Sequence, residues 1–211
     1  RYVRGMNFGL ANLWKEDKWE KYDSFFLLTN DTKIPKNQKT IITLQKLLKK
    51  HPKVGIISPC SQKWGEKKLI GYNSIKYFWF IHNNAYFLRR EFVDQIINKK
   101  KPYSKNFLFD GNNFRGYLSE SELIAKAYAN DWAAAITTSV FAEEDENLLL
   151  DKSYIIKTET YKENINLYVE EGLKWMHQKY GFNSKWQMMQ YVKLFYDKFF
   201  EYFPEYKKFK I

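Results

Sequence analysis

The segment Ser24-Phe25-Phe26-Leu27-Leu28-Thr29-Asn30-Asp31-Thr32 contains the strand that decides the fold of this chain. Its first five residues form an almost continuous apolar run, which is typical of a β-strand buried on both faces. A second run of this kind, Val54-Gly55-Ile56-Ile57-Ser58-Pro59, follows a helix that Pro35 opens and His51-Pro52 closes. Two buried strands with a helix between them predict a parallel α/β sheet.

Apolar periodicity divides the rest of the chain into alternating strands and helices. The expected elements are, in chain order, a helix at 10–21, strands at 77–81 and 85–88, helices at 90–98 and 120–130, and a strand at 132–140. From residue 162 onward the pattern is helical and strongly aromatic, with interruptions at Gly181 and Pro204. The sequence therefore predicts an α/β core over residues 1–150 and a helical C-terminal extension over 151–211 that packs on it.

The composition restricts the partners of this chain. Its 211 residues include 35 Lys and Arg against 24 Asp and Glu, which gives a net charge of +11. This excess favours anionic partners such as nucleotides, nucleic acids or an acidic membrane surface. Aromatic residues make up 19% of the chain, and basic, aromatic surfaces bind single-stranded nucleic acid. The lysines, however, recur as short runs at the ends of apolar segments, a pattern typical of solvated helix ends and loops.

Several function classes find no support in the sequence. Its three histidines are scattered and Cys60 is its single cysteine, so the spacing of a zinc site is missing. The chain contains no Gly-x-Ser-x-Gly motif, no Gly-rich phosphate loop and no dinucleotide fingerprint. Its apolar runs are shorter than the roughly 18 residues that a membrane span needs. A single cysteine is typical of a reducing compartment, which predicts a cytoplasmic location.

A cluster of polar residues follows the first buried strand and includes one carboxylate, Asp31. Open α/β sheets bind ligands just beyond the carboxyl ends of their strands. A carboxylate at that place can coordinate a hard divalent cation, and the cation can neutralise a diphosphate. The alternative is that Asp31 only caps a turn, because Asn-Asp-Thr is common turn chemistry.

Two further carboxylates, Glu120 and Glu122, lie at the start of the helix expected at 120–130. Ser119 and Glu122 have the spacing of a capping box, in which the serine is the N-cap. Carboxylates at a helix N-terminus are also stabilised by the helix dipole. A glutamate in a cleft beside an aromatic side chain can instead take a proton from an attacking hydroxyl. Both interpretations stay open at this point.

Taken in order, these segments resemble the inverting family 2 glycosyltransferases of the GT-A fold. Phe26-Leu27-Leu28-Thr29-Asn30-Asp31 is similar to the strand that ends in the family's DxD-type motif. Residues 52–59 resemble the next family strand, and residues 79–92 its aromatic strand with an Arg-Arg helix start. Residues 109–132 resemble the segment that carries the catalytic Glu-Asp pair. The resemblance, over about residues 5–140, implies a GT-A-type, Rossmann-like α/β fold: a mainly parallel sheet flanked by helices, with a helical C-terminal tail.

The resemblance implies roles for two carboxylates. Asp31 matches the aspartate that binds a metal ion, Mn²⁺ or Mg²⁺, and through it the diphosphate of a nucleotide-sugar donor. Alignment on Leu123 places Glu120 at the position of the base that deprotonates the acceptor hydroxyl. Attack from the face opposite the nucleotide then inverts the anomeric carbon. The other residues at matching positions are Asn7, Asn12 and Asn30 for the nucleotide, and Trp79, Asn83, Asn84, Gly116, Tyr117 and Glu122 for the sugar or the acceptor.

The chain departs from the family pattern at several places. Thr29 stands where the family has Asp or Asn, and Ser119-Glu120 replaces its Glu-Asp pair. No histidine follows the last expected strand, so the second metal ligand is unassigned, and the acidic segment 143–146 is one candidate for it. The family also has two strands before its asparagine-containing helix that this sequence lacks, and we expect them to exist in a longer chain.

The expected function is that of a metal-dependent inverting glycosyltransferase in polysaccharide, lipopolysaccharide or glycoprotein synthesis. Its donor would be a nucleotide-diphosphate sugar, and its acceptor a hydroxyl of a glycan, a lipid-linked or a protein-linked group. Peripheral contact with the inner face of a membrane stays open, and no nucleic-acid partner is expected. Two alternatives remain. One is a non-catalytic relative that binds a glycan or nucleotide sugar, which the departures at Thr29 and Ser119 favour, and the other is a basic, aromatic nucleic-acid-binding domain.

Overall fold

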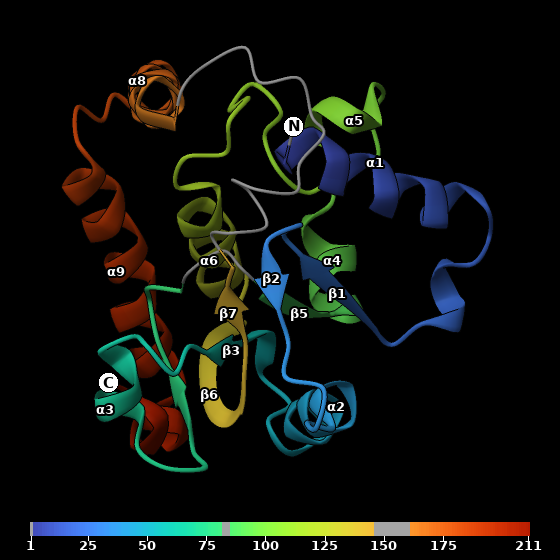
Figure 1. Ribbon diagram of the computed structural model, residues 1–211, viewed down its shortest axis with the longest axis vertical. Helices are drawn as coiled ribbons and strands as arrows, with labels where there is room; N and C mark the ends of the chain where they lie inside the picture. The colour runs from blue at the N-terminus through green and yellow to red at the C-terminus, as the bar shows by residue number, and fades with distance from the viewer. Residues whose placement is uncertain (1, 82–84, 146–160) are drawn as a thin grey trace.

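The computed structural model describes residues 2–81, 85–145 and 161–211. In these ranges a mixed sheet has five strands in the order β1-β5-β3-β6-β4. Their bounds are β1 (Ser24–Leu28), β3 (Val54–Cys60), β4 (Ile75–Tyr77), β5 (Ala85–Arg89) and β6 (Ala133–Phe141). A separate ribbon pairs β2 (Thr32–Lys33) with β7 (Glu143–Glu144), and Figure 1 shows it in front of the sheet.

The strand directions correct one prediction from the sequence. β5 runs antiparallel to β1 and β3, and β4 runs antiparallel to β6, so that β3 and β6 are the one parallel pair of neighbours in the described sheet. The expectation of a mainly parallel sheet is therefore wrong. The α/β class, with flanking helices and a helical C-terminal part, is confirmed. Apolar runs predict strands but do not tell which strand lies beside which, and here β5 lies between β1 and β3.

Three strands nevertheless point the same way. β1 and β3 are each antiparallel to β5, and β6 is parallel to β3. The carboxyl ends of β1, β3 and β6 therefore share one edge of the sheet. The turn with Asp31 and the acidic segment that begins at Glu143 follow β1 and β6 at this edge. Open α/β sheets bind their ligands at such an edge.

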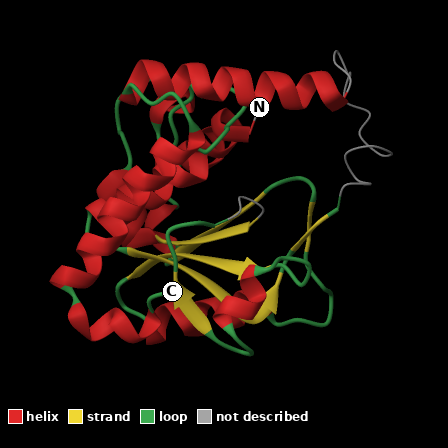
Figure 2. Cartoon of the chain, turned by 90° about the vertical axis from the view of Figure 1, so that its left-hand side faces the viewer, coloured by secondary structure: helices red, strands yellow, loops and turns green. Residues whose placement is uncertain are grey.

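The helices lie around the sheet and at one end of it, as Figure 2 shows. They are α1 (Tyr2–Lys15), α2 (Thr40–Lys50), α3 (Glu66–Ile70), α4 (Arg90–Ile96), α5 (Tyr103–Asn106), α6 (Ser119–Ala129), α8 (Tyr161–Tyr180) and α9 (Lys185–Tyr202), with 3-10 turns at Trp19–Lys21 and Pro204–Phe209. In Figure 2, α8 runs along the top of the molecule, away from the strands. In the described ranges, no helix combines the length and the apolar character that crossing a bilayer requires.

Helix α1 begins earlier than the sequence pattern predicts, at Tyr2 instead of residue 10. Its buried residues are Val3, Asn7, Leu10 and Ala11. These positions follow the helical spacing i, i+4, i+7 and i+8. The stripe is hard to recognise in the sequence because one of its members is a polar asparagine.

Aromatic residues of the C-terminal part belong to the core. Helix α9 buries Tyr196, Phe199 and Phe200. The Tyr196 ring meets Tyr128 of α6 with centroids 5.4 Å apart, and the Phe200 ring meets Tyr77 of β4 at 6.3 Å. Each such ring removes a large apolar area from water. These aromatic residues therefore serve packing, not an exposed stacking surface.

Candidate functional site

Asp31 lies in the turn that follows β1, at the shared carboxyl edge of the sheet. Thr29 and Thr32 close this turn: the Thr32 N–H donates to the Thr29 carbonyl at 3.1 Å, and their hydroxyl oxygens lie 2.7 Å apart. The Oδ1 atom of Asp31 is buried and has no hydrogen-bond partner among the described residues. Turn capping therefore does not account for this oxygen. A buried carboxylate oxygen is costly unless a cation or a donor compensates its lost hydration.

The acidic segment 143–145 lies beside Asp31. Thr32 is opposite Glu144 in the β2–β7 ribbon, and the N–H of Asp145 donates to the carbonyl oxygen of Asp31 at 2.8 Å. The fold thus brings the second metal-ligand candidate of the sequence analysis next to the first. The negative charge of this segment makes the surroundings of Asp31 more attractive to a cation.

Two members of the acidic segment are engaged within the protein. Glu143 accepts a hydrogen bond from the Ser61 hydroxyl at 2.6 Å, and Asp145 forms an ion pair with Lys33 at 3.7 Å. The fourth acidic residue, Glu146, lies outside the described residues. The ribbon is therefore fastened to the end of β3 as well as to the end of β1.

The described ranges contain no group of three or more His, Cys, Asp or Glu side chains that could hold a metal ion. An ion that binds a diphosphate does not need such a group, because Mg²⁺ is usually held by one or two carboxylates together with phosphate oxygens and water. Asp31, with its buried Oδ1, fits the role of one such carboxylate.

Glu120 is buried in the first turn of α6. This helix begins at Ser119, and the residue before it, Leu118, has left-handed backbone angles (φ 56°, ψ 21°) and makes no side-chain capping bond. Ser119 is therefore the first helical residue, and its predicted role as the N-cap is wrong. Glu120 thus lies at the positive end of the helix dipole, where negative charge is stabilised.

Four tyrosines lie close enough to Glu120 for its charge to act on them. Burial raises the pKa of Tyr2, Tyr86, Tyr117 and Tyr168, and the Glu120 carboxylate raises each pKa further. The four phenols come from α1, β5, the segment before α6, and α8. They are neutral at physiological pH and can act as hydrogen-bond donors; the Tyr86 hydroxyl donates to the Ile81 carbonyl at 3.5 Å, which leaves Tyr2, Tyr117 and Tyr168 for a carboxylate or a substrate oxygen.

The charges of both carboxylates that the sequence predicts for the site, Asp31 and Glu120, act on Tyr2. After burial, the charges of Glu120 and Asp31 are both among the causes that raise its pKa. The Tyr2 ring packs against Phe109 with centroids 5.9 Å apart, and a Cβ at Gly116 would lie 3.2 Å from its Cδ1. The predicted substrate residue Gly116 therefore contacts Tyr2. Both carboxylates therefore lie within electrostatic reach of one buried phenol.

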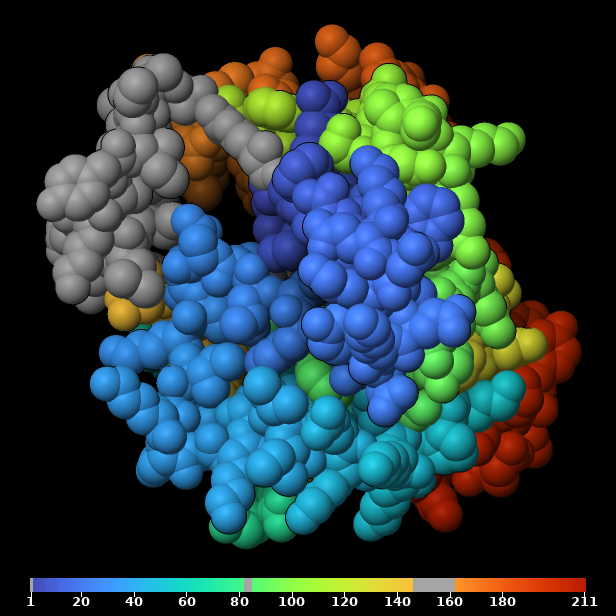
Figure 3. Space-filling model, turned by 90° about the vertical axis from the view of Figure 1, so that its right-hand side faces the viewer, coloured from blue at the N-terminus to red at the C-terminus, as the bar shows by residue number. Residues whose placement is uncertain are grey.

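Figure 3 shows a hollow between the start of α1 (dark blue), the segment after β1 (lighter blue) and α8 (orange). Tyr2 and Tyr168 belong to two of these elements. No sequence motif marks Tyr2, Tyr86 or Tyr168 as a site residue, because only the fold brings them near Glu120.

Glu122 has a structural role in this arrangement. It lies on a different face of α6 from Glu120, because residues two apart do not share a helix face. Its Oε1 accepts hydrogen bonds from Lys179 Nζ at 2.6 Å and from the Tyr180 hydroxyl. Asp110 Oδ2 accepts a bond of 2.7 Å from the same ammonium group. Glu122 thus links α6 to α8, and this geometry gives no support to its predicted contact with an acceptor.

Asn7, predicted at the nucleotide site, is fully buried and uses its whole amide to hold another segment. Its Nδ2 donates to the carbonyl oxygens of Ser104 (3.1 Å) and Phe109 (2.8 Å). Its Oδ1 accepts from the N–H groups of Leu108 and Phe109, both at 2.9 Å. Asn7 therefore fastens the segment before Asp110 to α1, and contact with a nucleotide stays a prediction that this geometry does not support.

The remaining predicted residues are spread around the site. Asn12 lies ten residues beyond Tyr2, about 15 Å along the helix, and lines a separate groove of about 280 Å³. Asn30 is exposed in the turn directly before Asp31. Trp79 is half-buried, with its ring 5.6 Å from that of Phe78. Asn83 and Asn84 lie outside the described residues.

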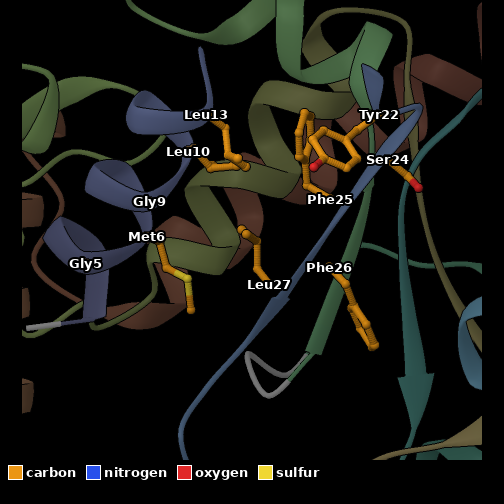
Figure 4. Close-up of a pocket in the computed structure, with 10 residues that line it drawn as sticks. All are labelled: Gly5, Met6, Gly9, Leu10, Leu13, Tyr22, Ser24, Phe25, Phe26 and Leu27. Atoms are coloured by element: carbon orange, nitrogen blue, oxygen red, sulfur yellow. The ribbon is translucent and has the colours of Figure 1, made fainter. Parts of the chain in front are cut away.

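An apolar groove runs between α1 and β1, with a volume of about 390 Å³. In Figure 4, Leu10 and Leu13 of α1 face Phe25 of β1 across it. At Gly5 and Gly9, a Cβ atom would have no neighbour within 4 Å, which leaves the groove open. None of its lining residues is charged, so the groove offers apolar surface near the carboxylates but no acid–base group of its own.

Comparison of the chain with models of protein families, with curated proteins and with solved structures finds no match. The geometry of the site therefore carries the functional argument.

Proposed function

We propose that this protein is a metal-dependent inverting glycosyltransferase that moves a sugar from a nucleotide-diphosphate donor to an acceptor hydroxyl. The observation that carries the proposal is that Asp31, in the turn after β1, and Glu120, in the first turn of α6, both act by their charge on the buried Tyr2 phenol, whose ring contacts Gly116. A cation-binding carboxylate and a second carboxylate in a buried, aromatic setting are the two groups that such a transfer requires.

Asp31 would hold the cation. Its buried Oδ1 has no donor in the described protein, and a divalent cation supplies the interaction that this oxygen lacks. When bound, the cation neutralises the diphosphate as it leaves the sugar. The net charge of +11 also draws an anionic donor towards the protein.

Glu120 would be the general base. It takes the proton of the acceptor hydroxyl while the hydroxyl oxygen forms a bond to the anomeric carbon, and the bond from that carbon to the diphosphate breaks with its electron pair. Attack from the side opposite the diphosphate inverts the configuration. The helix dipole of α6 stabilises negative charge at Glu120, and the neutral phenols of Tyr2, Tyr117 and Tyr168 can orient the reacting hydroxyl groups.

The direct test is the release of nucleoside diphosphate from UDP-, GDP- and dTDP-linked sugars with Mn²⁺, in the presence of mono- and disaccharide acceptors. We expect release by the wild type and losses of about 100-fold or more in Asp31→Asn and Glu120→Gln. Asp17→Asn and Glu20→Gln, which change exposed carboxylates in the segment that follows α1, are the matched controls and should release at the wild-type rate. A wild-type rate in Glu120→Gln overturns its role as the base.

A further inference from the structure

Tyr117 is held between two residues in the left-handed backbone region. Gly116 has a φ of 85° and Leu118 a φ of 56°. A non-glycine residue in this region costs about 1–3 kcal/mol and persists where its surroundings enforce it. Leu118 packs in a cluster with Trp175 and Met188, so the C-terminal helices supply this enforcement. The backbone therefore fixes the direction of the Cα–Cβ bond of Tyr117.

Helix α8 packs directly on the Tyr117 side chain. A Cβ at Gly172 would lie 2.3 Å from Cβ and 2.5 Å from Cδ1 of Tyr117, so that only glycine permits this approach. Tyr168, one turn earlier in α8, meets the Tyr117 ring edge to face, with centroids 5.0 Å apart and an interplanar angle of 82°. The two rings form a fixed corner of aromatic surface.

Polar contacts hold α8 in this position along its length. Arg115, whose side chain is 7% exposed, forms an ion pair of 3.2 Å with Glu171. Trp175 Nε1 donates to Asp110 Oδ2 at 3.1 Å, and Lys179 Nζ donates to the same oxygen. Arg115 and Asp110 both lie in the segment that leads into α6. The corner and the helix that carries Glu120 therefore form one rigid arrangement.

The corner leads directly to the proposed base, because Tyr117 precedes Glu120 by three residues. Tyr117 and Tyr168 are both only half-buried, and the Glu120 charge acts on both phenols. Helix α8 also borders the hollow that Figure 3 shows. A ligand that covers the exposed parts of these rings would place its nearest polar groups near Glu120.

From this geometry we propose that Tyr117 and Tyr168 form the acceptor subsite and that its ligand is a carbohydrate. The inference rests on the proposed function, because it assigns Glu120 the acceptor hydroxyl. A sugar ring presents C–H groups on its faces and hydroxyl groups at its rim. The aromatic faces take the C–H groups, and the neutral phenols bind the hydroxyl groups. Helix α8 is thereby part of the substrate site and not only a packing element.

The test is binding of the labelled protein to an array of defined mono- to tetrasaccharides, together with the assay of nucleoside diphosphate release. We expect the wild type to bind a set of these glycans. Tyr168→Ala and Tyr168→Leu should weaken binding by about ten-fold or more, because each removes the stacking ring, whereas Tyr168→Phe should retain most of it. Tyr202→Ala, which removes a tyrosine of α9 that is 71% exposed, is the matched control and should bind as the wild type.

The outcomes separate this inference from the proposed function. Absence of wild-type binding, or wild-type binding in both Tyr168→Ala and Tyr168→Leu, overturns the acceptor subsite even if donors are turned over. Binding that depends on Tyr168 without release of nucleoside diphosphate keeps the carbohydrate subsite and overturns the transferase. Thermal unfolding of each variant identifies one that fails to fold, and Tyr168→Leu keeps apolar packing where Tyr168→Ala does not.

Discussion

The main-chain N–H of Asp145 donates a hydrogen bond of 2.8 Å to the carbonyl oxygen of Asp31. This bond joins the segment that follows β6 to the turn that follows β1, and the β2–β7 ribbon continues the connection. Asp31 and the acidic segment that begins at Glu143, which are far apart in the sequence, are thus held side by side. A cation bound at Asp31 would therefore also be attracted by the negative charge of the acidic segment beside it.

This arrangement predicts that Mn²⁺ and a nucleoside diphosphate together stabilise the protein. A ligand at about 100 times its Kd adds about 2.7 kcal/mol to the free energy of unfolding. We expect UDP or GDP with Mn²⁺ to raise the melting temperature of the wild type and of the Asp17→Asn control, but not that of Asp31→Asn. Differential scanning fluorimetry measures the shift, and an equal shift in Asp31→Asn contradicts the role of this carboxylate.

The close approach of α8 to Tyr117 predicts opposite effects of alanine at two helical glycines. In Gly172→Ala the new methyl group collides with Tyr117, which should lower the free energy of unfolding by about 1–3 kcal/mol. In Gly9→Ala the methyl group enters open space within α1, and the better helix propensity should raise stability by about 0.5–1 kcal/mol. Urea unfolding compares the two, and a stable Gly172→Ala variant would show that α8 is not packed as described.

The Asp110–Lys179 contact predicts a loss of stability in acid. Burial alone would raise the pKa of Asp110, but hydrogen bonds from Lys179, the Asn112 N–H and Trp175 outweigh it and lower the pKa below 3.8. A depressed carboxyl pKa contributes stability above the unfolded pKa, and this contribution is lost as the pH falls through the folded pKa.

We therefore expect Asp110→Asn to cost about 2 kcal/mol near neutral pH, with a smaller difference from the wild type below about pH 3. Urea unfolding at both pH values measures this. The control is Glu201→Gln, which removes an exposed partner of Lys198 and should cost less than about 1 kcal/mol. A difference that does not change with pH would contradict the assignment.

His51 predicts a second pH dependence, nearer to neutrality. Its ring is buried, with Nδ1 at 3.2 Å from the Tyr77 hydroxyl, and burial together with the charges of Lys50 and Lys208 lowers its pKa below 6.5. Below about pH 6.5 the unfolded chain binds a proton at His51 that the folded protein binds less well. Stability is therefore full above that pH and decreases as the pH falls below it.

The measurement is the melting temperature between about pH 7.5 and pH 5.5, where histidine is the side chain that titrates. The decrease seen in the wild type should become smaller in His51→Gln. It should persist in His177→Gln, which changes an exposed histidine. An identical decrease in wild type and His51→Gln would show that another group causes it.

The sequence predicts the positions of most strands, but not the order in which they pair in the sheet. Buried strands at β1, β3 and β5 lie where continuous apolar runs predict them, and β6 and α6 begin within a residue of the predicted positions. The predicted strand at 77–81 instead spans Ile75–Tyr77. The Phe78 N–H still donates to the Ala134 carbonyl of β6 at 2.9 Å, and Trp79 and Phe80 pack against the core beyond the strand. Local patterns report burial and period, and they carry no information on pairing or direction.

The candidate site shows the same division. The sequence singled out Asp31 and Glu120 as chemical residues, because polar groups at a strand end and carboxylates at a helix start have recognisable settings. It also predicted a substrate contact for Glu122, although Glu120 acts on the buried tyrosines and Glu122 belongs to the ion network with Lys179. Which face of α6 meets which neighbour depends on packing with distant segments.

The sequence by itself determined the α/β class, the helical C-terminal part and the excess of positive charge, since each is set by composition or by a short-range period, and it predicted Asp31 and Glu120 as the carboxylates of the site. Only the tertiary structure decided the mixed strand order, the union of Asp31 with the acidic segment, and the tyrosines from α1, β5 and α8 beside Glu120. These features arise when residues far apart in the chain bury their apolar surfaces together, and the contacts that result are not encoded in any local pattern.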